Sequence, residues 1–320
     1  HGPSWANSLF EDNAEYGLGM VVAVNQLRGK LKAQVEKLVE CTNIEAIKTA
    51  GEAWLAGYDD GKNSRKESEA FVEVLENTNI ECPHCAAAAK EILAQKDFLV
   101  KKSIWCVGGD GWSYDIGFGG VDHVLASGED VNILVFDTEV YSNTGGQASK
   151  ATPAAAIAKF AASGKNTKKK DLGMIAASYG YVYVAQVAMG ADKNQFVKAI
   201  KEAEAYHGPS LVIAYAPCIN HGLRCGMGKT QENAKLAVEC GYWHLYRFNP
   251  ELEKEGKNPF TLDSKEPTGS FREFLMGQVR YTSLLKEFPD RAEALFQKAE
   301  ADAKDRLDGY KRRAAMVYGE

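Results

Sequence analysis

Two short apolar runs, each followed directly by a glycine-containing polar motif, constrain the fold of this chain most. Residues 104–107 (IWCV) lead into Gly109-Asp110-Gly111, and residues 131–136 (VNILVF) lead into 138–146 (TEVYSNTGG). Apolar runs of this length are typical of strands buried in a parallel sheet. Ligands of open α/β sheets bind beyond the carboxyl ends of the strands. The sequence therefore predicts that both motifs lie at one edge of a sheet and bind a shared ligand.

The residue types in these motifs suit a hard cation and a phosphate. Asp110 offers a carboxylate, Thr138 a hydroxyl and Val140 a main-chain carbonyl. Mg²⁺ prefers six oxygen ligands and usually takes several of them from a phosphate. Glycines allow the backbone to approach such a group closely and to adopt unusual angles. We therefore predict that these three residues hold Mg²⁺ against a diphosphate, with Asn143 near the diphosphate or the substrate.

From residue 103 onward, strands and helices alternate, which is typical of a parallel sheet with helices on both faces. The expected strands are 103–108, 131–137, 181–187 and 210–216, and the expected helices are 151–163, 192–206 and 229–240. Residues 249–269 are expected to be irregular, and a helical stretch is expected over 285–315. The fold class is thus α/β.

The first hundred residues have a different character. Residues 1–13 are interpreted as an extended lead-in with a turn at Gly2-Pro3. Apolar residues then recur at helical spacing over 14–41, which predicts one long amphipathic helix. Residues 43–100 are expected to form short helices with little strand.

Charge and hydrophobicity exclude two functional classes. The net charge is −5, which argues against nucleic-acid binding. No apolar run approaches the roughly 20 residues that cross a bilayer. The only dense basic run, Lys165 with residues 168–170, is expected to be a solvated loop. The chain begins abruptly at His1 without a signal peptide, and we interpret it as an internal piece of a longer polypeptide.

The number of cysteines, seven, is odd, and a chain of 320 residues is too large to need disulfides for its stability. We expect reduced thiols in a cytoplasmic or anaerobic setting. Cys106 lies on an expected strand and is assigned to the core. Cys82 and Cys85 form a CxxC pair, which is a common metal half-site. We expect them to be ordinary thiols, with a small metal or redox site as the alternative. Cys225 is assigned no role.

Longer runs carry a resemblance to a known family. They are 108–117 (GGDGWSYDIG), 137–147 (DTEVYSNTGGQ), 216–222 (APCINHG) and the opening 2–15 (GPSWANSLFEDNAE). Together they closely resemble the C-terminal cofactor domain of pyruvate:ferredoxin (flavodoxin) oxidoreductases. The likeness extends from residue 1 to about 245 and weakens over the last 75 residues.

The resemblance implies a fold and a domain layout. Residues 1–320 are expected to form one domain of a longer chain that binds thiamine diphosphate and Mg²⁺, with a mostly parallel sheet flanked by helices. Residues 42–100 are expected to be a helical insertion, and 281–320 a C-terminal helical extension. The glutamate that protonates the pyrimidine ring of thiamine is expected in a different domain, so this chain would hold only half of a site.

The resemblance also implies roles for particular residues. Asp110, Thr138 and Val140 are expected to ligate Mg²⁺, and Asn143 to lie near the reactive thiazolium as a catalytic residue. Residues 109–112 (Gly109, Asp110, Gly111 and Trp112) are expected to contact the cofactor. Cys218 is expected to be one ligand of a [4Fe–4S] cluster whose other three cysteines precede His1. His221 is expected to form a structural hydrogen bond, with a ligand or proton-transfer role as the alternative.

The implied reaction is oxidative decarboxylation of pyruvate to acetyl-CoA and CO₂, with electrons passed through iron–sulfur clusters. The expected partners are the remaining domains of the same polypeptide, pyruvate, coenzyme A, ferredoxin or flavodoxin, and a second copy in a homodimer. Neither nucleic acid nor a membrane is expected. The isolated segment is expected to be inactive.

Three alternatives remain open from the residues alone. The first is another 2-oxo acid:ferredoxin oxidoreductase. The second is a Rossmann-type dinucleotide-binding domain, which needs G-x-G-x-x-G after an early strand. Residues 117–120 (GFGG) do not fit that spacing. The third is a non-catalytic scaffold, which would not need Asp110, Thr138 and Asn143 together.

Overall fold

The computed structural model describes residues 12–318, so the turn predicted at Gly2-Pro3 lies outside the described residues. The chain divides into two compact units. Unit 1 comprises residues 19–104, and unit 2 comprises residues 12–18 and 105–318. Among residues 12–318, no helix is both long and apolar enough to cross a bilayer.

Unit 1 is entirely helical within the described residues, as the sequence predicts for residues 14–100. Its helices are α1 (Asn13–Cys41, which begins in unit 2), α2 (Glu45–Ala56), α3 (Ser64–Asn77), α4 (Pro83–Ala94) and the short η1 (Lys96–Phe98). Their apolar faces enclose one core that includes Leu31, Val35, Leu38, Ile47, Trp54, Phe71 and Ile92. Repeated burial at helical spacing explains why this pattern folds as a bundle.

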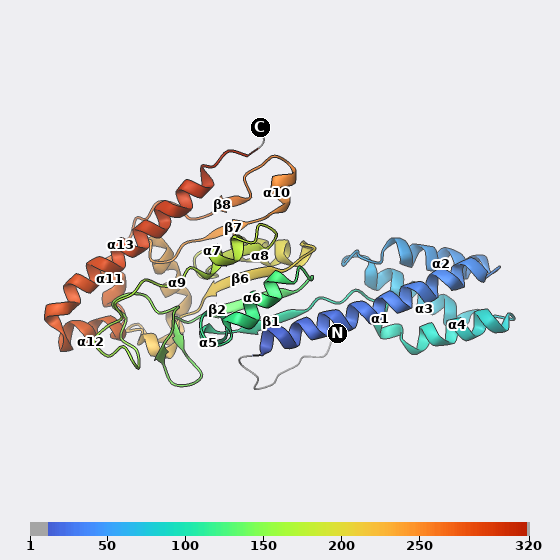
Figure 1. Ribbon diagram of the computed structural model, residues 1–320, viewed down its shortest axis with the longest axis horizontal. Coiled ribbons are helices and arrows are strands. Elements are labelled where there is room, and N and C mark those ends of the chain that lie inside the picture. The colour runs from blue at the N-terminus through green and yellow to red at the C-terminus, as the bar shows by residue number, and fades with distance from the viewer. Residues whose placement is uncertain (1–11, 319–320) are drawn as a thin grey trace. The chain divides into compact units, whose positions relative to one another are not determined.

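Unit 2 is built on a six-stranded sheet in the order β1-β2-β6-β5-β7-β8 (Figure 1). Four strands are parallel: β1 (Trp105–Gly108), β2 (Asn132–Asp137), β6 (Ser210–Tyr215) and β5 (Tyr183–Val187). These are the four strands predicted from the sequence, so the α/β, mostly parallel fold class is confirmed. A separate two-stranded hairpin pairs β3 (Val140–Tyr141) with β4 (Gln147–Ala148).

Helices connect and flank these strands. They are α5 (Asp110–Tyr114), α6 (Phe118–Ala126), α7 (Leu172–Ala177), α8 (Lys193–Ala205), η2 (Ile219–His221), η3 (Met227–Lys229), α9 (Thr230–Glu239), α10 (Glu251–Lys254), α11 (Phe271–Met276), α12 (Val279–Glu287) and α13 (Pro289–Ala314). The helices predicted over 192–206 and 229–240 are confirmed as α8 and α9. The predicted stretch 285–315 is instead the end of α12 and all of α13, separated at Phe288.

The helix predicted over 151–163 is wrong. This alanine-rich segment forms turns and bridges, and Ala155 and Phe160 have φ values of 71° and 66°. The amide of Ala155 donates to the carbonyl of Lys165, and the amide of Ile157 donates to that of Arg280. These long-range partners replace the local hydrogen bonds of a helix, so tertiary contacts override intrinsic propensity.

Two antiparallel strands beyond β5, the second of them an edge strand, were missed by the sequence pattern. β7 (Tyr246–Phe248) pairs antiparallel with β5, and β8 (Phe260–Leu262) pairs antiparallel with β7. β8 and α10 lie within 249–269, which was predicted to be irregular. The aromatic side chains of Tyr246 and Phe260 stack on each other and on Tyr310 of α13, which packs beside this edge (Figure 1).

The expectation that the lysine run is a solvated loop is wrong for its central residue. The side chain of Lys169 is only 4% exposed. Its Nζ bonds both carboxylate oxygens of Asp137, at 2.7 and 2.8 Å, and donates to the carbonyl of Ala151. Lys168, one residue earlier, is exposed and pairs with Asp302 and Asp305. Consecutive lysines in this segment thus point to opposite environments.

Candidate diphosphate and metal site

The carboxyl ends of three adjacent parallel strands bring the predicted site residues to one edge of the sheet. Asp110 follows β1 and begins α5, Thr138 follows β2, and Cys218 follows β6. β1 pairs with β2, and β2 pairs with β6, so the three ends are neighbours. This is the edge at which open α/β sheets bind their ligands.

Three oxygen-bearing groups meet at the tips of β1 and β2. Asp110 Oδ2 accepts hydrogen bonds from the Thr138 amide at 3.0 Å and from Thr138 Oγ1 at 2.5 Å. Thr138 Oγ1 also lies 3.1 Å from the carbonyl oxygen of Val140. The Thr138 hydroxyl therefore lies within hydrogen-bonding distance of both a carboxylate and a main-chain carbonyl. All three groups are ligand types that Mg²⁺ accepts.

One carboxylate oxygen of Asp110 has no partner in the described part of the chain. Asp110 is 2% exposed, and its Oδ1 is buried without a hydrogen bond. Burial, reinforced by the nearby charge of Asp137, raises the pKa of Asp110 well above its ordinary value. A buried carboxylate oxygen without a donor is costly unless a cation compensates it. The residues present therefore fit a divalent cation at this point.

The glycines around Asp110 are required by close packing rather than by unusual backbone angles. A Cβ on Gly108 would lie 2.3 Å from the Trp112 ring, and one on Gly111 would lie 2.5 Å from the Tyr141 ring. Gly109 has an ordinary extended conformation with φ −108°. The expectation that the glycines beside Asp110 supply special angles is therefore wrong. Steric space explains glycine at 108 and 111 but not at 109, where a Cβ would meet only the Phe136 carbonyl at 3.8 Å.

Trp112 and Asn143 lie in contrasting surroundings. Trp112 in α5 is 4% exposed, and its indole N–H is buried without a partner. Asn143 is exposed in the turn of the β3–β4 hairpin. The structure thus brings Asp110, Thr138 and Val140 together but leaves Asn143 at the tip of a loop. Ser142 was not predicted as a site residue, yet its hydroxyl lies 2.5 Å from that of Thr138.

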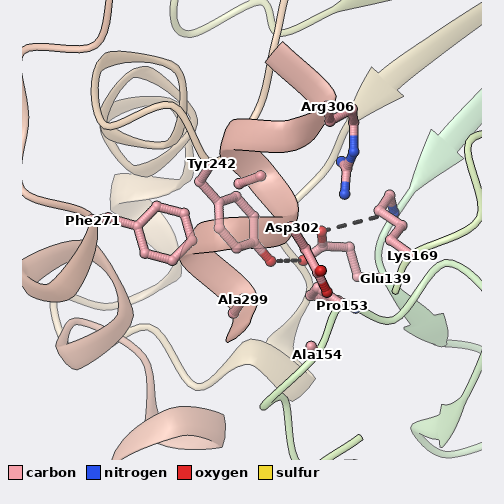
Figure 2. Close-up of a pocket in the computed structure, with 10 residues that line it drawn as sticks. Glu139, Pro153, Ala154, Lys169, Tyr242, Phe271, Ala299, Asp302 and Arg306 are labelled. Atoms are coloured by element: carbon pink, nitrogen blue, oxygen red, sulfur yellow. Dashed lines mark hydrogen bonds and ion pairs between the residues drawn. The ribbon is translucent and has the colours of Figure 1, made fainter. Parts of the chain in front are cut away.

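A network of buried charges supports the same strand ends. Asp137, the last residue of β2, is bonded by Lys169 and by the hydroxyl of Tyr114 at 2.6 Å. Glu139 is 1% exposed and accepts from Arg280 at 2.6 Å and from Tyr242 at 2.6 Å. Figure 2 shows the Tyr242 bond and the ion pair of Glu139 with Lys169, beside a small cavity.

Glu139 holds the chain in a rare conformation between two candidate ligands. Its φ is 60°, in the left-handed region that non-glycine residues seldom adopt. Burial alone would raise the pKa of Glu139, but Arg280 and Lys169 outweigh burial and lower it to about 2. The paired charge thus fixes the backbone turn that presents Thr138 and Val140 on its two sides.

His221 fulfils the predicted structural hydrogen bond. It is fully buried in η2, and its Nε2 lies 2.8 Å from the carbonyl oxygen of Thr138. Burial and the charge of Arg280 lower the pKa of His221 to about 3, so the neutral ring donates this bond.

Asp115 connects α5 to the segment after β4. Its carboxylate accepts hydrogen bonds from the Ser149 hydroxyl and, at 2.9 Å, from the Lys150 amide.

Cys218 is partly exposed just beyond β6, and its sulfur accepts from the side-chain amide of Asn220 at 3.4 Å. Cys106 is 3% exposed in β1, which confirms its assignment to the core. Among residues 12–318, no group of three His, Cys, Asp or Glu side chains is arranged to hold a metal ion. A site for a thiophilic metal built from this part of the chain alone is therefore absent.

The supporting residues were not found from the sequence. They are Tyr114, Asp137, Lys169, Tyr242 and Arg280. One signal was available in the sequence. Asp137 ends the apolar run that was predicted to be a buried strand, and a buried carboxylate requires a cation nearby. The sequence did not say which of the many lysines and arginines supplied it.

Comparisons with known proteins find a matching family model and several relatives. Residues 82–214 match the family model described as the thiamine pyrophosphate enzyme C-terminal TPP binding domain. The pyruvate:ferredoxin oxidoreductase of Moorella thermoacetica is 60% identical over 98% of this chain and 27% of its own length. The pyruvate-flavodoxin oxidoreductase of Klebsiella pneumoniae is 57% identical over 98% of this chain and 26% of its own.

A further relative is the mitochondrial pyruvate dehydrogenase [NADP(+)] of Euglena gracilis, 47% identical over 97% of this chain and 17% of its own length. The chain thus spans about a quarter or less of these relatives. The match to a solved structure, a 2-oxoglutarate:ferredoxin oxidoreductase from Magnetococcus marinus, covers 37% of this chain and 40% of that chain. The sequences are 25% identical and the TM-score is 0.34, so this likeness carries no argument. With a thiamine pyrophosphate-binding domain over 82–214 and homology along nearly its whole length, this chain belongs to the pyruvate:ferredoxin and pyruvate-flavodoxin oxidoreductase family.

Proposed function

We propose that Asp110, Thr138 and the carbonyl of Val140 hold Mg²⁺ against the diphosphate of thiamine diphosphate. The single observation that carries this proposal is the buried, unpartnered Oδ1 of Asp110 beside two further oxygen donors. Phosphate oxygens and water would complete the six ligands that Mg²⁺ requires. The amides at the start of α5 suit the same anionic group, because the N-terminus of a helix favours negative charge.

The remaining residues of this edge position the ligands. Glu139, fixed by Arg280 and Tyr242, holds the turn between Thr138 and Val140. We propose that Gly109, Gly111 and Trp112 contact the cofactor, and that Asn143 reaches the reacting centre from the hairpin. When bound, thiamine diphosphate supplies the carbanion chemistry that adds to a 2-oxo acid carbonyl and retains the electrons left by decarboxylation.

We further propose that the full-length protein converts pyruvate and coenzyme A to acetyl-CoA and CO₂ and passes the electrons to ferredoxin or flavodoxin. The names of the relatives support pyruvate over another 2-oxo acid. Relatives named for ferredoxin, flavodoxin and NADP(+) all share this segment, so we infer that the electron acceptor is chosen by other domains. A homodimer and a cytoplasmic setting complete the proposal, the latter supported by seven free cysteines.

Cys218 is the proposed ligand of a [4Fe–4S] cluster. Its place beyond β6, next to the strand that leads to Thr138, would bring a cluster close to the cofactor. Such a cluster needs four thiolates, and we propose that the other three come from residues before His1. Replacement of Cys218 by serine in the full-length protein should remove the electron paramagnetic resonance signal of this cluster. An unchanged signal would refute the assignment.

The metal assignment is tested by titrating thiamine diphosphate into full-length protein that has been freed of divalent cations. We expect tight binding with Mg²⁺ and little binding without it. Equal affinity in both titrations would overturn the role given to Asp110, Thr138 and Val140. We also propose that this chain holds only half of the catalytic site. A separate test is to assay the isolated 320-residue chain, which should not oxidise pyruvate.

A further inference from the structure

Three cysteines of unit 1 gather at the N-terminus of α4. Cys82 directly precedes this helix, Cys85 lies in its first turn, and Cys41 is the last residue of α1. The sulfur atoms of Cys41 and Cys85 are 3.0 Å apart. The thiol of Cys82 also interacts with that of Cys85. The buried thiol of Cys85 therefore lies between two other thiols, far in sequence from the proposed cofactor site.

Cys82 and Cys85 differ in exposure and acidity. Cys82 is exposed, and the amides of Cys85 and His84 together with the Cys85 thiol lower the pKa of Cys82 below its usual value. Cys85 is 2% exposed, and the neighbouring Cys41 thiol and burial raise the pKa of Cys85 to about 12. An exposed thiol with a lowered pKa at a helix N-terminus is the reactive member of many CxxC pairs, since the thiolate is the nucleophile.

The spacing of the sulfurs favours exchange chemistry over metal binding. Two thiolates on one tetrahedral zinc ion, at Zn–S distances of about 2.3 Å, lie about 3.8 Å apart. The Cys41–Cys85 pair is closer than that. Within residues 12–318 no three such side chains are arranged around a metal position. A shift of about 1 Å would bring this pair to the S–S bond length of about 2.0 Å.

We propose that Cys82, Cys85 and Cys41 form a thiol–disulfide exchange site that accepts oxidising equivalents from a small-molecule disulfide. The Cys82 thiolate attacks the external disulfide, forms a mixed disulfide and releases one thiolate. Cys85, after losing its proton to solvent, attacks the Cys82 sulfur and releases the second thiolate. Cys41, after losing its own proton to solvent, then attacks the Cys85 sulfur and expels the Cys82 thiolate. The two thiolates released from the external disulfide take up the two protons. In total, one external disulfide is reduced to two thiols and one Cys41–Cys85 disulfide forms.

The final position of the bond follows from the leaving groups. A thiol of lower pKa leaves faster and is more stable as the free thiolate. Cys82 is the thiol that its surroundings stabilise as a thiolate, so the disulfide should pass from the Cys82–Cys85 pair to the Cys41–Cys85 pair. Because the bond joins the end of α1 to the start of α4, oxidation would cross-link two helices of unit 1.

Tryptic mapping of the full-length protein after exposure to oxidised glutathione distinguishes these products. Trypsin releases Cys41 in peptide 38–48, both CxxC cysteines in 67–90, and the exposed Cys225 in 225–229. We expect a cross-linked pair of 38–48 with 67–90, formed faster than glutathione adds to Cys225. Adducts confined to single thiols, formed no faster than the adduct on Cys225, would overturn the proposal.

Variants separate the three roles. Cys41→Ser should stop the exchange at a disulfide within 67–90, and Cys85→Ala should stop it at glutathione bound to Cys82. Cys82→Ser should slow cross-linking about tenfold or more, because the reactive thiolate is lost. Cys225→Ser is the matched control and should leave the cross-link unchanged. Equal rates in the Cys82→Ser variant and the control would contradict entry through Cys82. Cys41 and Cys82 are exposed, so both serine variants should fold.

Discussion

The two compact units differ most in what they bury. Unit 1 encloses an apolar core, and Arg28, the one buried cation between residues 19 and 104, donates to the carbonyls of Tyr58, Phe98 and Leu99. Unit 2 buries several charged groups at the strand ends and leaves some of their atoms without a partner. Among the described residues these include atoms of Asp110, Trp112, Tyr215, His221 and Arg280.

This difference suits the interior of unit 1 to stability and the interior of unit 2 to ligand binding. A core whose polar atoms are nearly all satisfied mainly contributes stability, and in the described part of unit 1 the exception is Gln34 Oε1. A core with unpartnered polar atoms gives up stability, and such violations are expected at functional sites. We therefore expect substitutions in unit 1 to act on folding and those at the strand ends of unit 2 to act first on ligand binding. Four experiments test this contrast, from the largest expected effect to the smallest.

Replacing Asp110 by asparagine should separate binding from stability. We expect affinity for Mg²⁺–thiamine diphosphate to fall by more than the roughly 10–100-fold that loss of an outer-shell partner costs. Stability without cofactor should stay the same or rise, because the pKa of Asp110 shows that burying its charge is unfavourable. Calorimetry and urea unfolding measure the two effects. Asp290→Asn, at an exposed aspartate of α13, is the control. A loss of both properties together would contradict the contrast.

Replacing Glu139 by glutamine should destabilise unit 2 by about 3–5 kcal/mol, the usual cost of leaving one partner of a buried ion pair alone. The affected partner is Arg280, whose side chain is 1% exposed. Hydrogen exchange at β2 and β6 should report the change. Glu253→Gln, at an exposed glutamate of α10, should have no such effect. Unaltered exchange in the Glu139 variant would show that this pair adds little.

Replacing Phe71 by alanine should also cost about 3–5 kcal/mol, but by creating a cavity in unit 1. Phe71 is fully buried and stacks on Trp54 with ring centroids 6.4 Å apart. Cofactor affinity of the full-length protein should not change. Faster exchange in α2 and α3, with protection retained in β5 and β6, is the expected pattern. Loss of protection in both units would show that they unfold together.

Acid should weaken unit 2 through His244. Burial and the charge of Arg306 lower the pKa of His244 from 6.5 to about 3. As the pH falls below 6.5, the unfolded chain binds a proton at His244 before the folded chain does. The stability that the neutral, buried His244 gives the folded state is therefore complete above pH 6.5 and is lost as the pH falls toward 3. We expect the free energy of unfolding to fall by about 1–3 kcal/mol between pH 6.5 and pH 4, which is less than the full pKa difference would give. Unfolding of a His244→Gln variant should depend less steeply on pH. An identical pH profile would assign the acid sensitivity to other groups.

The sequence predicted the parallel strands well because each was a short, continuous apolar run. It also predicted the convergence of Asp110 with Thr138, since both follow such runs. The antiparallel strands β7 and β8 have only three residues each, and neighbouring prolines mask them. Strands that short carry no recognisable alternation. They are defined only by their pairing, of β7 with β5 and of β8 with β7.

The failure over 151–163 has a different physical cause. The alanines favour a helix locally, but Lys165 Nζ donates to the carbonyls of Ser149 and Thr152, and Lys169 donates to that of Ala151. Local propensity contains no information about side chains that arrive from a later segment. The buried charge network was missed for the same reason, because its members come from five separate parts of the chain.

The contrast between Lys168 and Lys169 has a practical consequence. Amine-directed reagents should modify the exposed Lys168 readily, whereas the side chain of Lys169 is enclosed as long as its bond to Asp137 persists. The extent of labelling at Lys169 relative to that at Lys168 is thus a ratio with its own internal reference. Mass spectrometry of that ratio would report local opening at the strand edge without a reporter group built into the protein.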